Sequence, residues 1–432
     1  MQLKNIKKEL GIATCALLQA PGVTVHASDS EWDIDTAVLY YSESDGRVQA
    51  FEPAVYAGRN LGDEGGRIDL RLVVDVLTGA TPNGAHASSV TQTFTTPSGT
   101  SSYTAQPGET PLDDSFKDTR VAAGADWTLP LNRLSRVKLG LNGSSEYDYM
   151  SLGVSATYLQ DFNNRNTTLS LGLAFNNDTI SPVGGVPTPL SPMRQPGQTN
   201  RLGDDDTKTV TDMILGITQV VSRNTLMQLN YSHGMLDGYM TDPYKIVTVV
   251  DPVTGLPDNS ALLNVNDDAL PYVYEKRPDS RQINSLFFRT VHHRNRDVIN
   301  FSYRYYWDDW GNTSNTFDVK YRYEIGRGYL QPQVRYYLQD AADFYRHNLV
   351  QGVDVDANGN VLLDHVSSDY RLAKLTSTTL SLKYGYALGD NSELSIRGGF
   401  MNQSIDDGDV PAGEETPDLD AIILNAGYSL RW

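Results

Sequence analysis

The chain has 432 residues, a formal net charge of -18, 25 tyrosines and a single cysteine. A chain this acidic repels nucleic acids, which excludes them as generic partners. Because the one cysteine is Cys15, the rest of the chain has no disulfide or thiolate chemistry.

The N-terminus resembles a secretory signal. Three lysines precede an apolar stretch at 10–18, and small residues follow at 25–27. We expect residues 1–27 to be the signal, cleaved after Ala27, and residues 28–432 to form one domain with a charge of about -20. A lipoprotein signal with Cys15 as the lipidation site is the alternative, although Thr14 fits that pattern poorly. No later segment reaches the roughly 18 consecutive apolar residues of a membrane-spanning helix.

Alternation of apolar and polar residues dominates the rest of the chain. In residues 66–79, Leu70 and Leu72 fall on one face of a strand, while Asp69 and Arg71 fall on the other. Residues 317–325 repeat the pattern with a charge at every second position. One face suits hydrocarbon and the other suits water, although a soluble sandwich could alternate in the same way.

The strand count and the loop lengths favour a membrane barrel. About 16 strands are predicted, at 31–42, 47–58, 66–77, 118–129, 134–144, 148–160, 166–177, 208–221, 225–236, 281–292, 297–309, 314–325, 328–340, 371–387, 392–403 and 418–432. Every long connection follows an odd-numbered strand, at 78–117, 178–207, 237–280, 341–370 and 404–417. We therefore expect an all-β protein, a single transmembrane antiparallel β-barrel of 14 to 18 strands, with short periplasmic turns and long extracellular loops.

The C-terminal strand adds a more specific signal. Tyr428, Leu430 and Trp432 alternate up to a terminal aromatic residue. This ending resembles the signal that the barrel assembly machinery reads. It indicates the cell outer membrane, with membrane lipid and lipopolysaccharide as the surroundings of the barrel.

The inward faces of the strands supply the predicted pore lining. Charges of both signs lie there, at Asp69, Arg71, Arg136, Lys138, Arg304, Asp308, Asp318, Lys320, Arg322, Glu324, Arg335, Lys383 and Arg397. A 16-stranded barrel is wide enough for an aqueous channel. The loop at 237–280 contains apolar pieces at 246–250 and 261–263, which predict a hairpin around 251–255 that plugs or caps the barrel and folds inward to constrict the pore.

One loop carries half of a calcium-binding pattern. Asp354, Asp356 and Asn358 place oxygen ligands at alternate positions, but position twelve of such a loop is His365 instead of a glutamate. The alternative is a hairpin whose tip is 358–359. Calcium in the extracellular loops is the only cofactor that the sequence suggests.

Five phrases resemble an uncharacterised family of bacterial exported proteins, which is defined only as a domain of unknown function. They are 75–84 (DVLTGATPNG), 146–149 (EYDY), 242–245 (DPYK), 275–281 (EKRPDSR) and 341–345 (AADFY). The resemblance covers nearly the whole chain after the signal. It implies an outer-membrane barrel and no catalytic residues.

The leading functional hypothesis is a porin-like barrel that passes small polar solutes. The alternative is an occluded barrel that acts as a scaffold for periplasmic or surface partner proteins. A second alternative, an outer-membrane hydrolase, lacks a convincing serine, histidine and acid set, so we expect no enzyme.

Overall fold

The computed structural model describes residues 32–44, 46–61, 66–87, 91–95, 102–109, 111–112, 116–194, 200–406, 408, 416 and 418–432. The expected signal at 1–27, Cys15 and most of the loop at 404–417 lie outside these residues. None of the short helices among the described residues has the length and apolar character needed to span a membrane.

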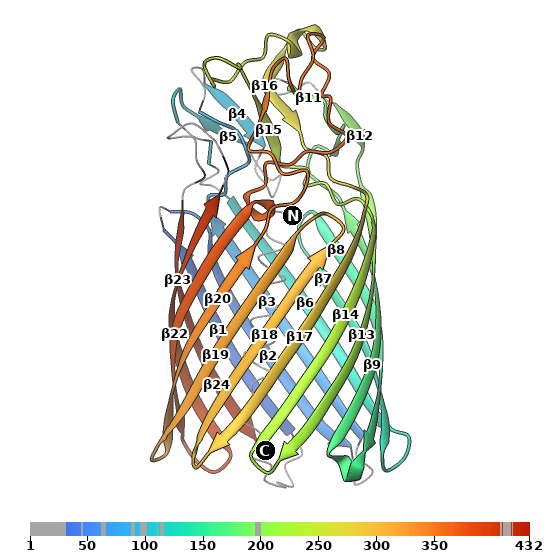
Figure 1. The fold of residues 1–432 in the computed structure, drawn as a ribbon, viewed down its shortest axis with the longest axis vertical. Coiled ribbons are helices and arrows are strands. Elements are labelled where there is room, and N and C mark those ends of the chain that lie inside the picture. The colour runs from blue at the N-terminus through green and yellow to red at the C-terminus, as the bar shows by residue number, and fades with distance from the viewer. Residues whose placement is uncertain are drawn as a thin grey trace.

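Sixteen antiparallel strands form a closed barrel (Figure 1). They are β1 (Trp32–Glu43), β2 (Gln49–Leu61), β3 (Gly66–Gly79), β6 (Phe116–Pro130), β7 (Ser135–Ser145), β8 (Tyr149–Phe162), β9 (Thr167–Ile180), β13 (Asp206–Ser222), β14 (Thr225–Gly238), β17 (Ser280–Arg294), β18 (Asp297–Asp308), β19 (Thr313–Ile325), β20 (Gly328–Gln339), β22 (Lys374–Ala387), β23 (Ser392–Asp406) and β24 (Leu419–Arg431). β1 pairs with β24 to close the ring, and the backbones of Trp32 and Trp432 exchange two hydrogen bonds. The predicted fold class and strand count are confirmed.

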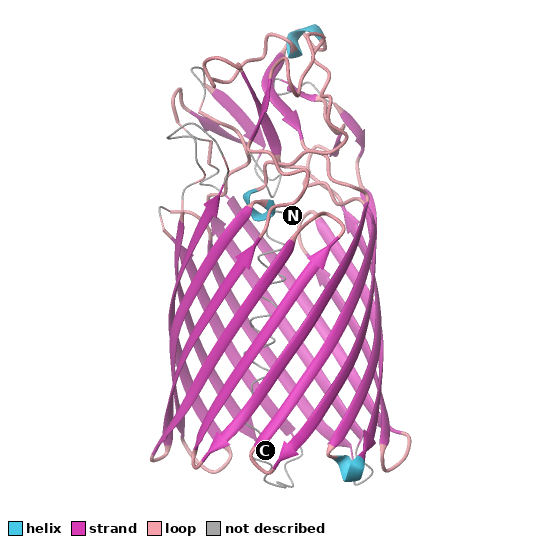
Figure 2. Ribbon diagram, viewed as in Figure 1, coloured by secondary structure: helices cyan, strands magenta, loops and turns pink. Residues whose placement is uncertain are grey.

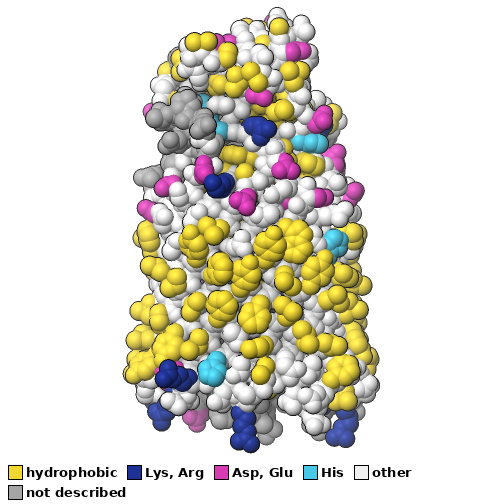
Figure 3. All heavy atoms as spheres, viewed as in Figure 1, with side chains coloured by type: hydrophobic (Ala, Val, Ile, Leu, Met, Phe, Trp, Pro, Cys, Tyr) yellow, Lys and Arg dark blue, Asp and Glu magenta, His cyan; other side chains and the backbone are white. Residues whose placement is uncertain are grey.

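The alternation of the sequence determines the two faces of the wall. Apolar side chains such as Leu141, Leu152 and Ile396 are more than half exposed on the outside. On the face drawn in Figure 3, apolar side chains form a broad band, above which acidic and basic side chains gather. The charged residues between them point to the inside, because successive side chains of a strand point to opposite faces.

The long loops lie at one end of the barrel and the short turns at the other (Figure 1). The described short turns are 131–134, 163–166, 223–224, 295–296, 326–327 and 388–391. One of them contains the 3-10 helix η1 (Asn163–Arg165). The C-terminus lies at this short-turn end. The predicted parity of long and short connections therefore holds.

The long loops fold together into a cap above one mouth of the barrel (Figure 2). Its central sheet has the order β11-β16-β15-β21. The cap strands are β4 (Gln92–Thr95), β5 (Ser102–Ala105), β10 (Val186–Pro187), β11 (Pro192–Arg194), β12 (Arg201–Gly203), β15 (Ile246–Val250), β16 (Ala269–Tyr274) and β21 (Asn348–Val350). Two further 3-10 helices belong to these loops, η2 (Leu262–Asn264) and η3 (Tyr370–Leu372).

Two details of the loop prediction were wrong. Residues 246–250 pair with β16 and, in parallel, with β21; they do not pair with 261–263. The segment at 261–263 instead enters η2, and Leu262 packs into the cap core with Val247 and Leu349. The sheet stands beyond the rim and not inside the ring of strands, so the loop caps the barrel and does not fold inward (Figure 1). Burial of all five β15 residues within the cap explains this position.

Candidate functional site

The inner wall of the barrel carries the predicted charged residues. On β19, Phe317 and Val319 are exposed outside, so Asp318 and Lys320, which alternate with them, face the lumen. Register places Arg335 opposite Asp318, and Lys383 opposite Arg397. Twelve of the thirteen predicted residues lie on this inner face, away from the capped mouth. That they line a conducting pore stays a prediction.

Asp308 is the exception. Its side chain is fully buried at the end of β18, where it pairs with Arg281 and accepts hydrogen bonds from the backbone amides of Trp310 and Asn312 at 3.0 and 2.9 Å. It holds the turn at 309–312 in place, so its prediction as a pore-lining residue was wrong. Alternation gives the face of a side chain, but not whether a turn folds over it.

The wall formed by β3, β6, β7 and β8 pairs each of its central bases with a carboxylate. Arg71 and Lys138 lie 3.1 and 3.2 Å from the same Asp126 oxygen, and Arg136 lies 3.0 Å from Asp161. The side chains of these three bases are 37–39 % exposed. A charge exposed on the inner face of a barrel needs water beside it, because burial without water or a partner is costly.

The wall formed by β17 to β23 is richer in bases. Arg322 lies 2.5 Å from Glu324 and stacks 3.6 Å from the centre of the Tyr329 ring. Lys383 lies 3.9 Å from Glu393. The remaining bases on this wall have fewer carboxylates available, and neutral side chains hold some of them.

A buried charge network lies where the cap meets the barrel. We call it the junction cluster. It contains three acids and three bases, each with a side chain at most 11 % exposed: Asp242, Lys245, Glu275, Arg277, Asp369 and Arg371. Asp369 is its centre, with Arg277 Nη2 at 2.9 Å, Arg371 Nε at 2.8 Å and Lys245 Nζ at 3.9 Å. Removing one member would leave an uncompensated buried charge.

The charges of the junction cluster perturb one another. Burial by itself raises the pKa of Asp369, but Arg371, Lys245 and Arg277 outweigh burial and hold that pKa below its usual value. Burial lowers the pKa of Lys245, against the pull of Asp369. Burial also raises the pKa of the neighbouring Tyr370 to about 12. Asp369 is therefore an anion that the three cations keep charged.

The junction cluster joins loops that are far apart in the sequence. Lys245 donates to the carbonyl of Pro82, and the amide of Ile246 donates to the carbonyl of Asn83 at 3.0 Å. Gly84 has a φ of +95°, and a Cβ there would lie 2.1 Å from the carbonyl oxygen of Ile246. The connections at 80–115, 239–279 and 340–373 thus meet at one point.

The phrases that resemble a known family gather at this junction. Tyr244 of the DPYK phrase donates to Asp148 of the EYDY phrase at 2.9 Å. The amide of Ala342 donates to the carbonyl of Leu372, next to Arg371. Sequence reasoning identified these phrases but missed Asp369 and Arg371, which lie in none of them. Only their position late in a long loop, before a strand, distinguishes those two residues in the sequence.

The half calcium loop uses its carboxylates within the chain. Asp354 accepts from the amide of Val350 at 2.8 Å, and Asp356 accepts from the amides of Asn358 and Asn360. The hydrogen bonds from Asn360 lower the pKa of Asp356. Among the described residues, no three metal-binding side chains of the His, Cys, Asp or Glu type gather at one place. Calcium binding by this loop stays a prediction.

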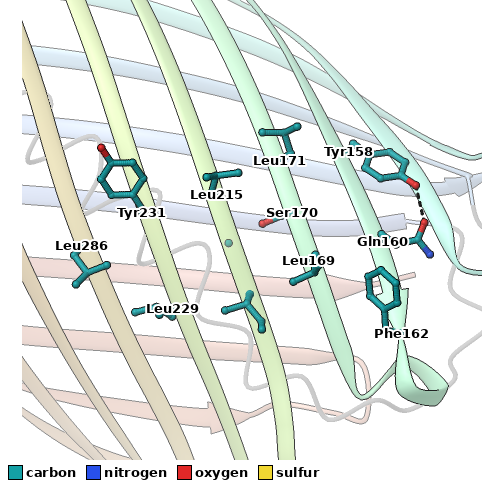
Figure 4. Close-up of a pocket in the computed structure, with 12 residues that line it drawn as sticks. Tyr158, Gln160, Phe162, Leu169, Ser170, Leu171, Leu215, Leu229, Tyr231 and Leu286 are labelled. Carbon is teal, nitrogen blue, oxygen red and sulfur yellow. Dashed lines mark hydrogen bonds between the residues drawn. The ribbon is translucent and has the colours of Figure 1, made fainter.

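A shallow groove of about 620 Å³ lies on the outer face of the barrel, near the short-turn end (Figure 4). It is almost wholly apolar and crosses β8, β9, β13, β14 and β17. Its lining includes Tyr158, Phe162, Leu169, Leu215 and Leu286. These side chains belong to the apolar outer band, so the groove is no site for a polar solute.

The end of the chain fits the expected assembly signal in position. Tyr428, Leu430 and Trp432 lie along the last strand of the barrel and at its end, and the Trp432 side chain is 75 % exposed. The backbone of Trp432 completes the pairing with β1. Recognition by the assembly machinery stays a prediction.

Comparison with known proteins gives one family and only distant structures. A family model described as "Protein of unknown function (DUF3570)" matches residues 7–430. No curated protein matches the chain. The similar solved structures include the Pseudomonas putida toluene transporter TodX, at 11% identity over 94% of this chain and 91% of that one, with a TM-score of 0.38.

Two other barrels match in a similar way. The outer membrane protein OpdK from Pseudomonas aeruginosa is 10% identical over 94% of this chain and 99% of its own, with a TM-score of 0.39. The siderophore receptor PirA from Acinetobacter baumannii is 9% identical over 93% of this chain and 60% of its own, with a TM-score of 0.42. At TM-scores below 0.5, these similarities say nothing about a solute.

Proposed function

The chain belongs to the DUF3570 family, whose description assigns no activity, and we propose that it is an outer-membrane channel for small polar solutes with a capped outer mouth. The family match confirms the resemblance to a family of unknown function. The activity must therefore be argued from the barrel. The observation that carries the proposal is the inner wall, where bases such as Arg71 and Lys138 and the carboxylates of Glu324 and Glu393 remain partly exposed over several strands.

The outer surface supports the membrane location. Exposed apolar side chains lie on strands all along the chain from β1 to β24, and on the face drawn in Figure 3 they form a broad band. On a soluble monomer, contiguous apolar patches rarely exceed a few hundred Å². An even strand number, short turns at one end and long loops at the other are the features of outer-membrane barrels. In outer-membrane barrels the long loops face outward and the short turns face the periplasm, which supports our proposal that the cap lies outside the cell.

The cap explains how such a channel would be controlled. It covers the outer mouth and is held there by the junction cluster, which ties three long loops together. Solute entry then requires either a gap beside the cap or a movement of the cap. The cap has an apolar core formed by cap residues alone, so it can move as a unit once its apolar contacts with the rim of the barrel are broken.

The cap apex favours a second candidate, a scaffold for a surface partner. Val253, Leu256, Val353 and Leu362 are 60–90 % exposed in the turns at the top of the cap. These turns lie side by side, because the amide of Gln351 donates to the carbonyl of Val250. Exposed apolar residues that lie together are typical of protein interaction sites. In this reading the barrel would anchor the apex and conduct nothing.

Single-channel conductance in a planar bilayer separates these two functions. The protein is refolded and compared with a variant in which a short glycine-serine linker replaces 243–275. A control variant loses only the apex turn at 252–256, outside the junction cluster. A channel predicts ohmic steps that grow in the first variant and stay unchanged in the control. Silence in all three proteins, with folded barrels shown by heat-dependent gel migration, would contradict the channel and favour the scaffold.

A further inference from the structure

The inner wall of β17 to β23 has an excess of positive charge, in a chain whose net charge is -18. Away from the mouth, seven basic side chains face the lumen there: Arg289, Arg304, Lys320, Arg322, Arg335, Lys383 and Arg397. Three carboxylates share that wall, Asp318, Glu324 and Glu393. Glu324 and Glu393 are each paired locally, with Arg322 and Lys383. The unbalanced charge therefore lies around Asp318.

Four bases surround this one carboxylate. Arg335 lies directly opposite it on β20, and the other three, Arg289, Lys320 and Arg397, we call the basic cluster. Asp318 is the acid in electrostatic range of each of them. Lys320 Nζ lies 3.7 Å from Asp318 Oδ1. Arg289 and Arg397 lie close enough to Lys320 to repel it. One negative charge thus serves the three bases of the cluster and Arg335.

Neutral amides position the guanidinium groups of the basic cluster. Arg289 Nε donates to Asn300 Oδ1 at 3.3 Å, and Arg397 Nη1 donates to Gln333 Oε1. Gln333 also accepts from Ser381 and donates to Asp318. Amide contacts fix the direction of a guanidinium without neutralising its charge. The buried Arg397 Nε has no hydrogen-bond partner among the described residues.

The wall across the lumen differs in its charge arrangement. Asp126 is shared by Arg71 and Lys138, and Asp161 partners Arg136. Arg67 binds Asp69 at 2.6 Å and Asp33 at 2.8 Å, so these four bases share four carboxylates. Bases there are balanced by carboxylates, so the field across the lumen points from the basic cluster toward the opposite wall. Low-dielectric walls on both sides concentrate such a field.

We propose that the basic cluster is a binding site for small oxyanions, carboxylates or phosphates, that pass through the barrel. Guanidinium forks present paired N–H donors that match the two oxygens of a carboxylate or phosphate. Lys320 adds a third charge, and Gln333 keeps Arg397 in place before the anion arrives. As a statement about transport, the inference rests on the proposed channel. As a statement about binding, it does not need conduction.

Calorimetry tests the binding site directly. Citrate and inorganic phosphate are titrated separately into the detergent-solubilised full chain at low salt, which distinguishes the two classes of oxyanion. Loss of one charged contact weakens binding about tenfold or more, so Lys320→Met and Arg397→Gln are each expected to reduce citrate affinity by at least that factor. Lys138→Met is the matched control on the opposite wall, where Arg71 still partners Asp126.

A variant that binds citrate more tightly cannot be explained by misfolding. Asp318→Asn removes the carboxylate that competes with the ligand, so it is expected to tighten citrate binding. Unchanged affinity in all three variants of this wall, or no binding of either probe to the native chain, would overturn the site.

Reversal potentials in a potassium chloride gradient test its role in transport. Lys320→Met is expected to shift the selectivity toward potassium, and Asp318→Asn toward chloride. Conductance with the same selectivity in both variants as in the native chain would overturn the role of the site in passage. The channel itself would not be contradicted. Absence of conductance together with intact citrate binding would contradict the channel but not the binding site.

Discussion

Asp369→Asn is the change that most directly probes the capped mouth. The side chain of Asp369 is fully buried and accepts from Arg277 at 2.9 Å and from Arg371 at 2.8 Å. Asparagine keeps the shape of the side chain but removes its charge. The three cations of the junction cluster then face only Asp242 and Glu275. Breaking a buried ion pair by removing one partner costs about 3–5 kcal/mol.

The matched control is Asp406→Asn at the same end of the barrel. Asp406 pairs with Lys374 at 2.8 Å, but both side chains are more than half exposed. An exposed pair contributes at most about 1 kcal/mol. The two variants therefore make the same chemical change at the mouth, and burial is the main difference between them.

Protease sensitivity of the cap measures the result. Thermolysin cuts beside large apolar residues. Those of the apex turns, such as Val253, are exposed and can be cut in the closed cap, whereas Val247 and Leu349 of the cap core are completely buried. Only cleavage beside these two core residues, identified by mass spectrometry of the fragments, is therefore counted. Cleavage then follows the population of the opened cap. A cost of 3 kcal/mol raises that population by about a hundredfold, so Asp369→Asn is expected to accelerate cap cleavage by about that factor. Asp406→Asn is expected to change it by less than about fivefold.

Equal cleavage rates in the two variants, with both barrels still migrating as folded on unheated gels, would refute this reasoning. The cap would then be held by its apolar contacts alone, and the junction cluster would have no part in closing the mouth.

Three other expectations follow from the same contacts. Gly84→Ala places a Cβ at a φ of +95° and within 2.1 Å of the Ile246 carbonyl oxygen, so cap cleavage by thermolysin should rise as it does in Asp369→Asn. The folded-state pKa of Asp369 lies below its unfolded value, so its contribution is complete above a pH of about 4 and is lost as the pH falls through the lowered pKa. Pepsin should therefore leave the buried cap core uncut beside Leu349 at about pH 4 and cut there only in stronger acid. Trp432→Ala keeps the backbone pairing with Trp32 but removes the terminal aromatic ring, so less assembled barrel should appear in outer-membrane fractions on unheated gels.

Local pattern was sufficient to predict the barrel. Each strand alternates over about a dozen residues, and antiparallel neighbours follow each other in the chain, so both the faces and the order can be read locally. In β19, for example, Phe317 and Val319 mark the outer face, and Asp318 and Lys320 mark the inner face. The turn chemistry between strands then fixed the ends of most strands to within a few residues.

The cap could not be derived in the same way, because its central strands β15 and β16 are buried on both faces. Residues 246–250 are uniformly apolar and therefore carry no alternation that would indicate a partner. One partner, β21, begins about a hundred residues later, at Asn348. The nearer apolar segment at 261–263 was the obvious choice by distance along the chain. In the folded cap, residues 246–250 pair with β16 and β21 instead.

The junction cluster escaped sequence reasoning for a related reason. A single charge in a long loop is normally solvated, and nothing near Asp369 or Arg371 in the sequence shows that both are buried. Their partners Lys245 and Arg277 lie about a hundred residues away. Conversely, Asp308 had the right alternation for the lumen, but the turn that follows it covers its side chain.

The most direct test of a water-filled passage uses two neighbouring residues that face opposite ways. Ser381 lies on the inner face beside Gln333, while Leu382 is half exposed on the outer face. Cys15 is the only native cysteine and lies in the expected signal, so Ser381→Cys and Leu382→Cys would each add a single thiol to the processed chain. A charged, membrane-impermeant methanethiosulfonate is added to each variant in a planar bilayer. The channel predicts that it modifies position 381 and alters the current, but leaves 382 untouched. Modification of neither thiol, or of both without any change in current, would contradict a solute passage through this barrel.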